Sequence, residues 1–423
     1  MALIEAIKQE NLEKVLAISS EISEKRRKRV LNLACKMGSF KIVKYLIESD
    51  ENLNTISHTN FETHFLHFLD AVTGGHLQIV EYLHHKIGIF VNALKEAAEH
   101  GHYEVVKYLY TNGKSNYSLN DINEAFERAC KGGCLDIIKY LLVEAKADVT
   151  SRFNNPVMIA AEHGHLEVVK YLCTFEDVNV RSGNDYALHW SCANGHLEMV
   201  KFLIEEKGAD PMSKLNFPIE QAAQYGHLQI VQYLQSKGAN LRSNIDYPLR
   251  IAAYHGHLEV VKFLTENGAD VRSKNNFAIR RAAEEGHLEV VKYLHEAGAD
   301  INILNYYAIK WASINGHLQV VKYIYENSDP LQLQLIVDSL VVYAYTNRSF
   351  EVIKYLIEKG ADSTVMESIP YFLFIEKMQK KIRERAQKKI YFWWIPISYS
   401  LEHHSGCGRR MMLKNYQNYL NIQ

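Results

Sequence analysis

The chain is poor in the residues that define several classes of protein. It has 6 cysteines, 7 prolines and 22 glycines among 423 residues, and no stretch of its sequence reaches 18 apolar residues. The small number of cysteines argues against a scaffold held by disulfides, and the low glycine and proline content argues against a disordered or collagen-like chain. The absence of a long apolar run argues against a membrane-spanning helix. The formal charge of −1 gives no overall attraction to nucleic acid.

The sequence also lacks the signals of secretion and catalysis. Glu5 and Lys8 interrupt the first residues, which have no apolar core followed by a small-residue cleavage site, so we expect a protein made in the cytosol. No nucleophile elbow, phosphate-binding loop, metalloprotease helix or kinase signature occurs. Cys130 and Cys134 are four residues apart, but no matching Cys or His pair completes a zinc pattern. We therefore expect no enzyme, no metal site and no cofactor.

A phrase close to Gly-His-Leu-Glu-Val-Val-Lys-Tyr-Leu returns eleven times, and from the third copy onward its spacing is 30 to 32 residues. A fixed period of this length is typical of a solenoid, in which two-element units bury apolar surface only by stacking on their neighbours. The copies begin at these anchor positions: Gly38, Gly75, Gly101, Gly133, Gly164, Gly195, Gly226, Gly256, Gly286, Gly316 and the degenerate Arg348.

One unit reads as helix, turn and helix. In the copy around Gly256, Pro248 suits the first turn of a short helix, and Gly256 allows the positive φ of the turn. At about 100° per residue, Leu258, Val261 and Leu264 fall in a broad apolar arc of the second helix. A helix that is apolar over most of its circumference must be covered on two sides, which indicates an interior solenoid helix.

The residues that recur with the repeat are best interpreted as packing. The position seven after the anchor is aromatic in all eleven copies, and an invariant stripe favours contact between units over recognition of a partner. Histidines flank most anchors, where we expect hydrogen bonds to the turn backbone in place of metal binding. Cys35, Cys130 and Cys192 stand three residues before an anchor glycine and are expected to be small buried hydrophobes.

The repeat resembles the ankyrin repeat. The residues Ala252-Ala253-x-x-Gly256-His257-Leu258-x-Val260-Val261-x-x-Leu264, followed by Gly268-Ala269-Asp270, match the second half of that family's motif, and the resemblance covers residues 28–363. It implies an all-α solenoid of about 11–12 helix-turn-helix units. The expected organisation is a degenerate capping unit over residues 1–27, an array over 28–365 and a basic, aromatic C-terminal segment over 366–423.

The unit here is shorter than the usual ankyrin period of about 33 residues. The deficit lies before the first helix, where the family's Thr-Pro-Leu-His is replaced by such sequences as Tyr247-Pro248-Leu249-Arg250, and only His189 keeps the family's histidine. The resemblance therefore implies short loops in place of the long β-hairpin fingers of ankyrin proteins.

The repeated phrase, together with Tyr391-Phe392-Trp393-Trp394-Ile395-Pro396-Ile397, also resembles the expanded ankyrin families of giant DNA viruses of amoebae. That resemblance implies a viral protein that acts in the host cytoplasm. The run Lys25-Arg26-Arg27-Lys28-Arg29 is interpreted as an exposed helix face, with a nuclear signal as the alternative.

A partner is expected on first-helix positions that vary between units. In an ankyrin-like stack the first-helix positions just after the loop and the two residues before the anchor face the concave side. Besides lysine, these positions carry arginine and aromatic residues, the types enriched among interface hot spots. The alternative is a solvated helix with the tryptophans packed between units. The partner-binding hypothesis comprises Trp190, Arg250, Tyr254, Arg280, Arg281, Lys310 and Trp311.

The partner expected from this surface is an acidic, aromatic-containing protein or peptide of host origin. Nucleic acid is the weaker interpretation, because Glu220, Glu284 and Glu285 interrupt the short basic track. The sequence thus predicts a non-enzymatic, monomeric scaffold for protein–protein interaction.

The C-terminal segment suggests an alternative function. Residues 366–423 hold ten Lys and Arg against four Asp and Glu, a charge of +6 that leaves −7 for the rest. Trp393 and Trp394 follow seven of these bases and could dock on the last unit, on a protein or on a membrane surface. Residues 367–373 resemble the start of an F-box-like segment, which implies an adaptor that recruits a ubiquitin ligase while the repeats hold the target.

Overall fold

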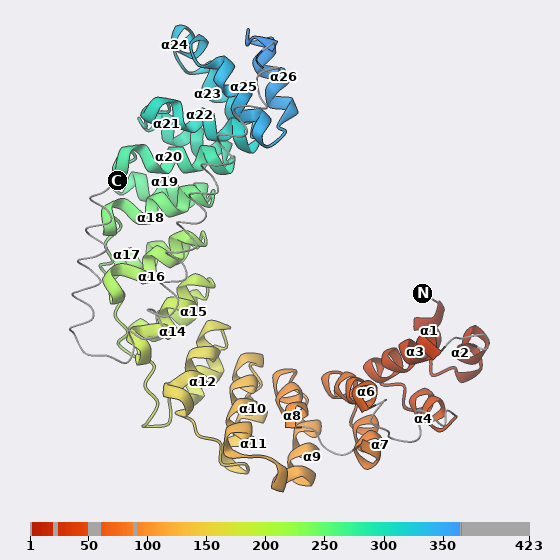
Figure 1. Ribbon diagram of the computed structural model, residues 1–423. Coiled ribbons are helices and arrows are strands. Elements are labelled where there is room, and N and C mark those ends of the chain that lie inside the picture. Colours follow the sequence, from red (N-terminus) through yellow and green to blue (C-terminus); the bar gives the residue numbers. More distant parts are fainter. Residues whose placement is uncertain (1, 20–23, 50–60, 88–90, 364, 366–423) are drawn as a thin grey trace, which may run out of the picture. The chain divides into compact units, whose positions relative to one another are not determined.

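The computed structural model describes residues 2–19, 24–49, 61–87, 91–363 and 365 (Figure 1). All regular structure in these residues is helical, and no strand occurs among them. The chain divides into two compact units, Met1–Lys274 and Asn275–Gln423, with the boundary inside helix α20 (Ser273–Glu285). The expected all-α solenoid is confirmed, and the helices stack within each unit as helix-turn-helix pairs (Figure 1).

The first unit stacks its helices in chain order, and the first helices of successive pairs from α8 to α18 contact one another. Helix α3 begins at Glu24 and so includes the run of bases at residues 25–29. The elements are α1 (Ala2–Lys8), α2 (Leu12–Ser19), α3 (Glu24–Met37), α4 (Phe40–Glu48), α6 (Phe61–Thr73), α7 (Leu77–Ile87), α8 (Val91–Glu99), α9 (Tyr103–Gly113), the 3-10 helix η1 (Lys114–Asn116), α10 (Leu119–Gly132), α11 (Leu135–Val143), α12 (Ser151–Glu162), α13 (Leu166–Leu172), α14 (Ser182–Ala193), α15 (Leu197–Glu205), α16 (Ser213–Gln224), α17 (Leu228–Ser236), α18 (Ser243–Tyr254) and α19 (Leu258–Glu266).

The second unit repeats the pattern and adds one short helix between its last two pairs. In it, α22 packs on α25, and α23 packs on α26. After α20, its elements are α21 (Leu288–Glu296), α22 (Ile303–Asn315), α23 (Leu318–Glu326), α24 (Pro330–Gln334), α25 (Val337–Thr346) and α26 (Phe350–Glu358).

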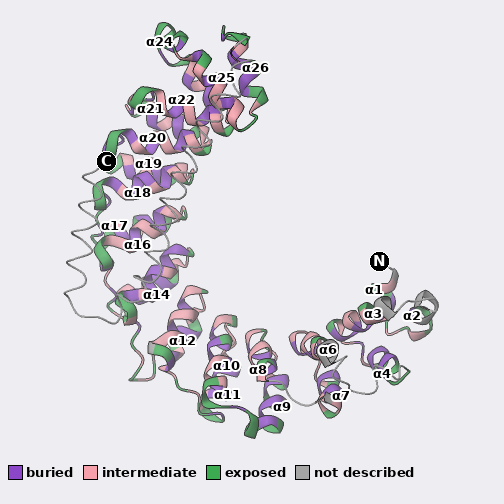
Figure 2. Ribbon diagram, viewed as in Figure 1, coloured by how far each residue is buried: buried purple, intermediate pink, exposed green. Residues whose placement is uncertain are grey.

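The core of each pair consists of the apolar residues that recur with the repeat. Val260, Val261 and Leu264 of α19 are at most 1% exposed, and Ala252 and Ala253 of α18 are fully buried. In Figure 2 the buried colour runs along the inside of successive pairs, and the exposed colour lies on outer helix faces and loop tips. The predicted small-hydrophobe role of Cys35, Cys130 and Cys192 is confirmed, because all three thiols are free and buried.

A histidine ring of one pair closes the turn of the pair before it. Gly226 has a φ of +79°, and a Cβ there would lie 2.5 Å from Nδ1 of His257. Nε2 of the same ring lies 2.9 Å from the carbonyl oxygen of Gln224. The turn therefore needs glycine for two reasons, since it requires a positive φ and leaves no room for a side chain.

This histidine contact repeats along the first unit. His76, His102, His165, His196 and His227 each place Nε2 2.8–3.0 Å from a carbonyl oxygen of the preceding pair. The local bonding to turn backbone that we expected occurs at His100 and His163, which lie before the anchor and bond carbonyl oxygens four residues back. The histidines after the anchor bond to the preceding pair instead, which corrects that expectation for them.

The loops before the first helices are short, as expected. Three consecutive residues at the tip adopt left-handed backbone angles, as in Lys214, Leu215 and Asn216 of α16 or Asn244, Ile245 and Asp246 of α18. The right-handed part of α18 then begins at Tyr247, with Pro248 in its first turn. The short loop that we expected in place of a long β-hairpin is therefore a single left-handed turn.

The last residue of the turn holds the next loop in place. The Asn216 side-chain oxygen accepts a hydrogen bond from the Asn240 N–H at 2.9 Å, and Asp246 accepts one from the Asp270 N–H at 3.2 Å. Left-handed angles are unfavourable by roughly 1–2 kcal/mol for residues other than glycine, asparagine and aspartate. Bonds between repeats offset this strain, so the loop conformation depends on the neighbouring repeat.

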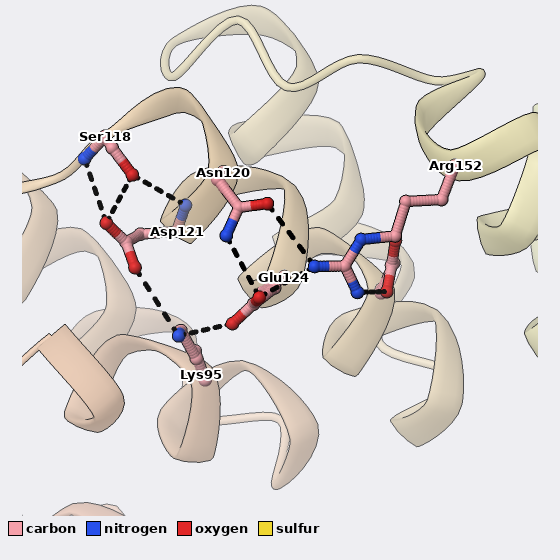
Figure 3. A network of polar contacts seen from close by, with 7 residues as sticks. Lys95, Ser118, Asn120, Asp121, Glu124 and Arg152 are labelled. Atoms are coloured by element: carbon pink, nitrogen blue, oxygen red, sulfur yellow. Dashed lines mark hydrogen bonds and ion pairs between the residues drawn. The ribbon is translucent and has the colours of Figure 1, made fainter.

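A polar network joins three pairs of the first unit (Figure 3). Lys95 of α8 forms ion pairs with Asp121 and Glu124 of α10, and Glu124 also accepts a hydrogen bond from Arg152 of α12 at 2.7 Å. Hydrogen bonds from Lys95 and Arg152 lower the pKa of Glu124 to about 2. The charges of this network satisfy one another, so its main effect is to link successive first helices.

Candidate partner-binding site

The second unit brings four of the seven predicted contact residues together on α20 and α22. Arg280 lies between two aromatic rings, with its guanidinium carbon 5.6 Å from the Phe277 ring centre and 4.8 Å from that of Tyr307. Its Nε donates a hydrogen bond to the Asn275 carbonyl oxygen at 2.9 Å, and burial lowers the pKa of its guanidinium. The side chain is thus fixed against the loop and the next helix.

Arg281 and Trp311 extend this arrangement. Nη1 of Arg281 lies 2.6 Å from a carboxylate oxygen of Glu284, and the Tyr307 hydroxyl donates to the same oxygen at 3.0 Å. The Trp311 ring is tilted against Tyr307, with ring centres 5.8 Å apart. Arginine and tyrosine therefore share one carboxylate, and the aromatic side chains form a packed row beside them.

Lys310 supplies the third cation. Its Nζ lies 6.0 Å from the centre of the Tyr343 ring of α25, and burial lowers its pKa. Within the described residues no carboxylate forms an ion pair with this ammonium group. We call Arg280, Arg281, Lys310 and Trp311 the cationic cluster, in which Arg281 forms an ion pair with Glu284.

The structure corrects the assignment of Arg250 to an open surface. Arg250 is only 5% exposed, and its Nε and Nη2 donate to the carbonyl oxygens of Ile245 at 3.0 Å and Asn244 at 2.8 Å. Its guanidinium therefore closes the left-handed turn of its own repeat. Arg250 also belongs to the first unit, whereas the cationic cluster lies in the second.

Trp190 and Tyr254 also lie in the first unit, and both are half-buried. Trp190 packs on Tyr186 with ring centres 5.8 Å apart, and Tyr254 makes an edge contact with His255 at 4.8 Å. Neither of these contacts brings them to a cation of the predicted surface. Their part in partner binding stays a prediction.

The position six before the anchor often has a structural role that sequence reasoning missed. His189 places Nε2 2.8 Å from Ser213 Oγ of the next repeat, and Glu220 accepts a hydrogen bond from Ser243 Oγ at 3.1 Å. Burial lowers the pKa of His189 to about 4 and raises that of Glu220. The serines recur about 30 residues apart, and this recurrence was the available signal for a contact between repeats.

Two further expectations concern metal binding and the C-terminal segment. Across the described residues, no group of three or more His, Cys, Asp or Glu side chains could hold a metal ion. In the same part of the chain, no helix is long and apolar enough to cross a membrane. Trp393 and Trp394 lie outside the described residues, so the docking hypothesis for them stays a prediction.

Comparison with known proteins identifies the repeat. A family model described as ankyrin repeats in three copies matches residues 66–153, 126–214, 219–305 and 279–367. An ankyrin repeat protein of Acanthamoeba polyphaga mimivirus is 28% identical over 143 residues, which are 32% of this chain. The match spans 22% of that relative's length.

Proposed function

Because this chain belongs to the ankyrin-repeat family, whose arrays are protein–protein interaction modules, we propose that it is a non-enzymatic scaffold that holds a protein partner on its cationic cluster. The partner presents acidic and aromatic side chains. The similarity to a viral ankyrin protein supports a viral origin, with a host protein as the partner and the host cytoplasm as the place of binding.

The observation that carries this proposal is the state of Lys310. Its ammonium group is partly removed from water, as its lowered pKa reflects, without an ion pair among the described residues. A partner carboxylate at this position would compensate the lost hydration and add a charge-assisted hydrogen bond. An acidic group is therefore the ligand that most improves the environment of this lysine.

The aromatic side chains define the second requirement. Tyr307 and Trp311 are half-buried, and their packing against each other restricts their rotation. Rigid aromatic side chains provide contact area at a low cost in conformational entropy. An aromatic or apolar partner residue next to the acidic group would use this surface.

The test compares two lysines of the same unit. Lys310→Glu reverses the charge at the cluster, while Lys322→Glu does so on α23, where Nζ of Lys322 lies 5.5 Å from the centre of the Tyr355 ring. Full-length wild type and both variants are used to capture amoebal proteins, and bound proteins are identified by mass spectrometry. We expect a protein retained by wild type and by Lys322→Glu to be lost with Lys310→Glu.

Equal capture by all three chains, with equal far-UV circular dichroism, would refute the cluster as the contact surface. Lys310 is a better probe than Arg280, because the Arg280 guanidinium also holds the Asn275 carbonyl and its loss would disturb the loop. Lys310→Gln separates loss of attraction from repulsion, and we expect it to weaken binding less than Lys310→Glu.

The C-terminal segment carries the alternative, an adaptor that brings a ubiquitin ligase or a membrane surface to the target. Trp393 and Trp394 are the residues to change in the full chain. If the adaptor alternative holds, Trp393→Ala/Trp394→Ala removes ligase subunits or lipid vesicles from the captured material and leaves the target bound. Loss of the target itself would contradict this division of roles.

A further inference from the structure

A surface hollow of about 500 Å³ lies between α9 and α11 in the first unit, far along the chain from the cationic cluster. Its lining residues are Tyr103, Asp136, Lys139, Tyr140, Val143 and Glu144. Asp136, Tyr140 and Val143 share one face of α11 because they are spaced four and three residues apart. Tyr103 enters from the first turn of α9.

Two tyrosines form the aromatic wall of the hollow. The Tyr140 ring makes edge contacts with Tyr103, at 5.7 Å between ring centres, and with Tyr110, at 6.1 Å. Val143 is 57% exposed beside them. The wall thus offers fixed aromatic faces and apolar surface to a ligand from solvent.

Tyr103 is an exception within the repeat. The position two after the anchor holds leucine in eight of the eleven copies and phenylalanine at Phe40 and Phe350, so Tyr103 is its one tyrosine. Leucine at this position is compatible with the fold in the neighbouring copies, for example at Leu135 and Leu166. The Tyr103 ring contacts Tyr140 of the next pair, as Phe40 contacts Tyr82, but leucine serves this packing in eight copies, so stacking does not require the tyrosine hydroxyl.

Asp136 is a second exception. Four copies place a glutamate at the position three after the anchor and pair it with the lysine three residues later: Glu167–Lys170, Glu198–Lys201, Glu259–Lys262 and Glu289–Lys292. The equivalent Lys139 instead lies over the Tyr171 ring, with Nζ 5.5 Å from its centre. The shorter Asp136 therefore keeps an exposed carboxylate that forms no ion pair within the described part of the chain.

Glu144 adds a second carboxylate at the other end of this face. It is exposed, and the salt bridges between described residues do not include it. Two carboxylates and one lysine thus surround the tyrosine wall, and the lysine is already placed over another ring. A cation on an apolar stem fits this combination, since it gains cation–π contact with tyrosine and charge-assisted hydrogen bonds to carboxylates.

We propose that this hollow binds an arginine side chain from an exposed basic segment of a protein partner. The planar guanidinium stacks on the Tyr103 and Tyr140 rings and donates to Asp136 and Glu144, a combination that suits arginine better than lysine. The hollow is open to solvent, so it receives a side chain from a partner's surface. The site is independent of the cationic cluster, and the loss of one site leaves the other in place.

The repeat itself supplies the variant that tests the proposal. Tyr103→Leu/Asp136→Glu installs the residues found in other copies, and the new glutamate can pair with Lys139 as its counterparts do. The fold is therefore expected to remain intact, which far-UV circular dichroism and thermal unfolding verify. Glu167→Gln, which removes a carboxylate from the equivalent position of the next copy, is the matched control for charge.

The probe is a dye-labelled peptide of glycine and serine with two central arginines, and its partner probe carries citrulline, which has the shape of arginine without the charge. Fluorescence anisotropy with the full chain measures both. We expect binding of the arginine peptide to be roughly fivefold tighter than that of the citrulline peptide, in keeping with a cation–π contact of about 1 kcal/mol.

Tyr103→Leu/Asp136→Glu is expected to abolish this preference, and Glu167→Gln to leave it unchanged. Equal affinity for the two peptides, no binding at millimolar peptide, or an unchanged preference in the double variant would each overturn the proposal. An equal loss in Glu167→Gln would overturn it too, because the effect would then follow net charge and not the hollow.

Discussion

The glycine at the turn between paired helices permits a quantitative test of how the repeats are joined. Gly226 and Gly238 both have a positive φ, of +79° and +92°. A Cβ on Gly226 would lie 2.5 Å from His257 Nδ1, whereas a Cβ on Gly238 would meet nothing within 4 Å. Alanine at the two positions therefore shares the backbone strain and differs in the clash.

The expected magnitudes follow from this difference. Left-handed backbone costs a residue with a Cβ about 1–2 kcal/mol, which is the whole effect expected for Gly238→Ala. Gly226→Ala must in addition displace the His257 ring, with about 1–3 kcal/mol of overpacking. Displacement also breaks its bond to the Gln224 carbonyl, worth about 1 kcal/mol. We expect Gly226→Ala to destabilise the chain by about 2–4 kcal/mol more than Gly238→Ala.

Urea unfolding followed by circular dichroism measures the two variants, and the comparison is valid where the slopes agree. A double-mutant cycle identifies the cause: in the His257→Ala background, Gly226→Ala should cost no more than Gly238→Ala. Equal destabilisation by Gly226→Ala and Gly238→Ala in the wild-type background would refute the argument that the ring excludes a side chain. An unchanged cost of Gly226→Ala in the His257→Ala background would refute it as well.

Three further predictions concern buried polar groups. Burial lowers the folded-state pKa of His189 to about 4 and also lowers that of His196, so the unfolded chain binds more protons than the folded chain between these pKa values. The urea midpoint should therefore fall as the pH drops from about 6.5 towards 4. His189→Leu should reduce this pH dependence. Arg250→Ala should destabilise the first unit by roughly 2–3 kcal/mol, because two loop carbonyls lose a charged donor, and should leave partner capture through Lys310 unchanged. Burial raises the pKa of the Cys192 thiol, so iodoacetamide should label it only in urea, as mass spectrometry of the modified peptide can show.

The fold could be predicted because its determinants repeat. The anchor glycine, the alanine pair and apolar residues such as Val261 and Leu264 recur with a period near 30, and each recurrence reports the same buried environment. The short loops followed from comparing this period with the longer usual ankyrin period. The left-handed turn at residues 214–216 was beyond prediction, because Leu215 disfavours that conformation and the bond that offsets it comes from the next loop.

The candidate site could be predicted only in part. Lys310 and Trp311 were found because their positions vary between copies, and the structure leaves both half-buried with one side to solvent. Variation between copies led to a wrong prediction of exposure for Arg250. A buried polar position can also vary if each residue has its own hydrogen-bond partners, and Arg250 bonds two carbonyl oxygens of its loop. The hollow at Tyr103 could not be predicted from the recurring residues, because Tyr103 departs from the repeat in a single copy.

The contact between each turn and the next repeat also bears on how such a gene can change. The hydrogen bonds between a turn and the following repeat, which we call a joint, connect residues 29 to 40 positions apart. At nearly every joint a histidine Nε2 meets a backbone carbonyl oxygen. Ser39, Cys134 and Ser349 take the place of the histidine at three joints, so the joint itself tolerates some sequence change. Unequal recombination that removes or duplicates one whole copy would leave every joint with a chemically matched neighbour, whereas an insertion of a few codons would break the register. Gain or loss of complete copies is therefore the change in length that such a gene can undergo without disrupting these contacts. A copy that differs from the others, such as the one with Tyr103, can be kept unchanged through such events.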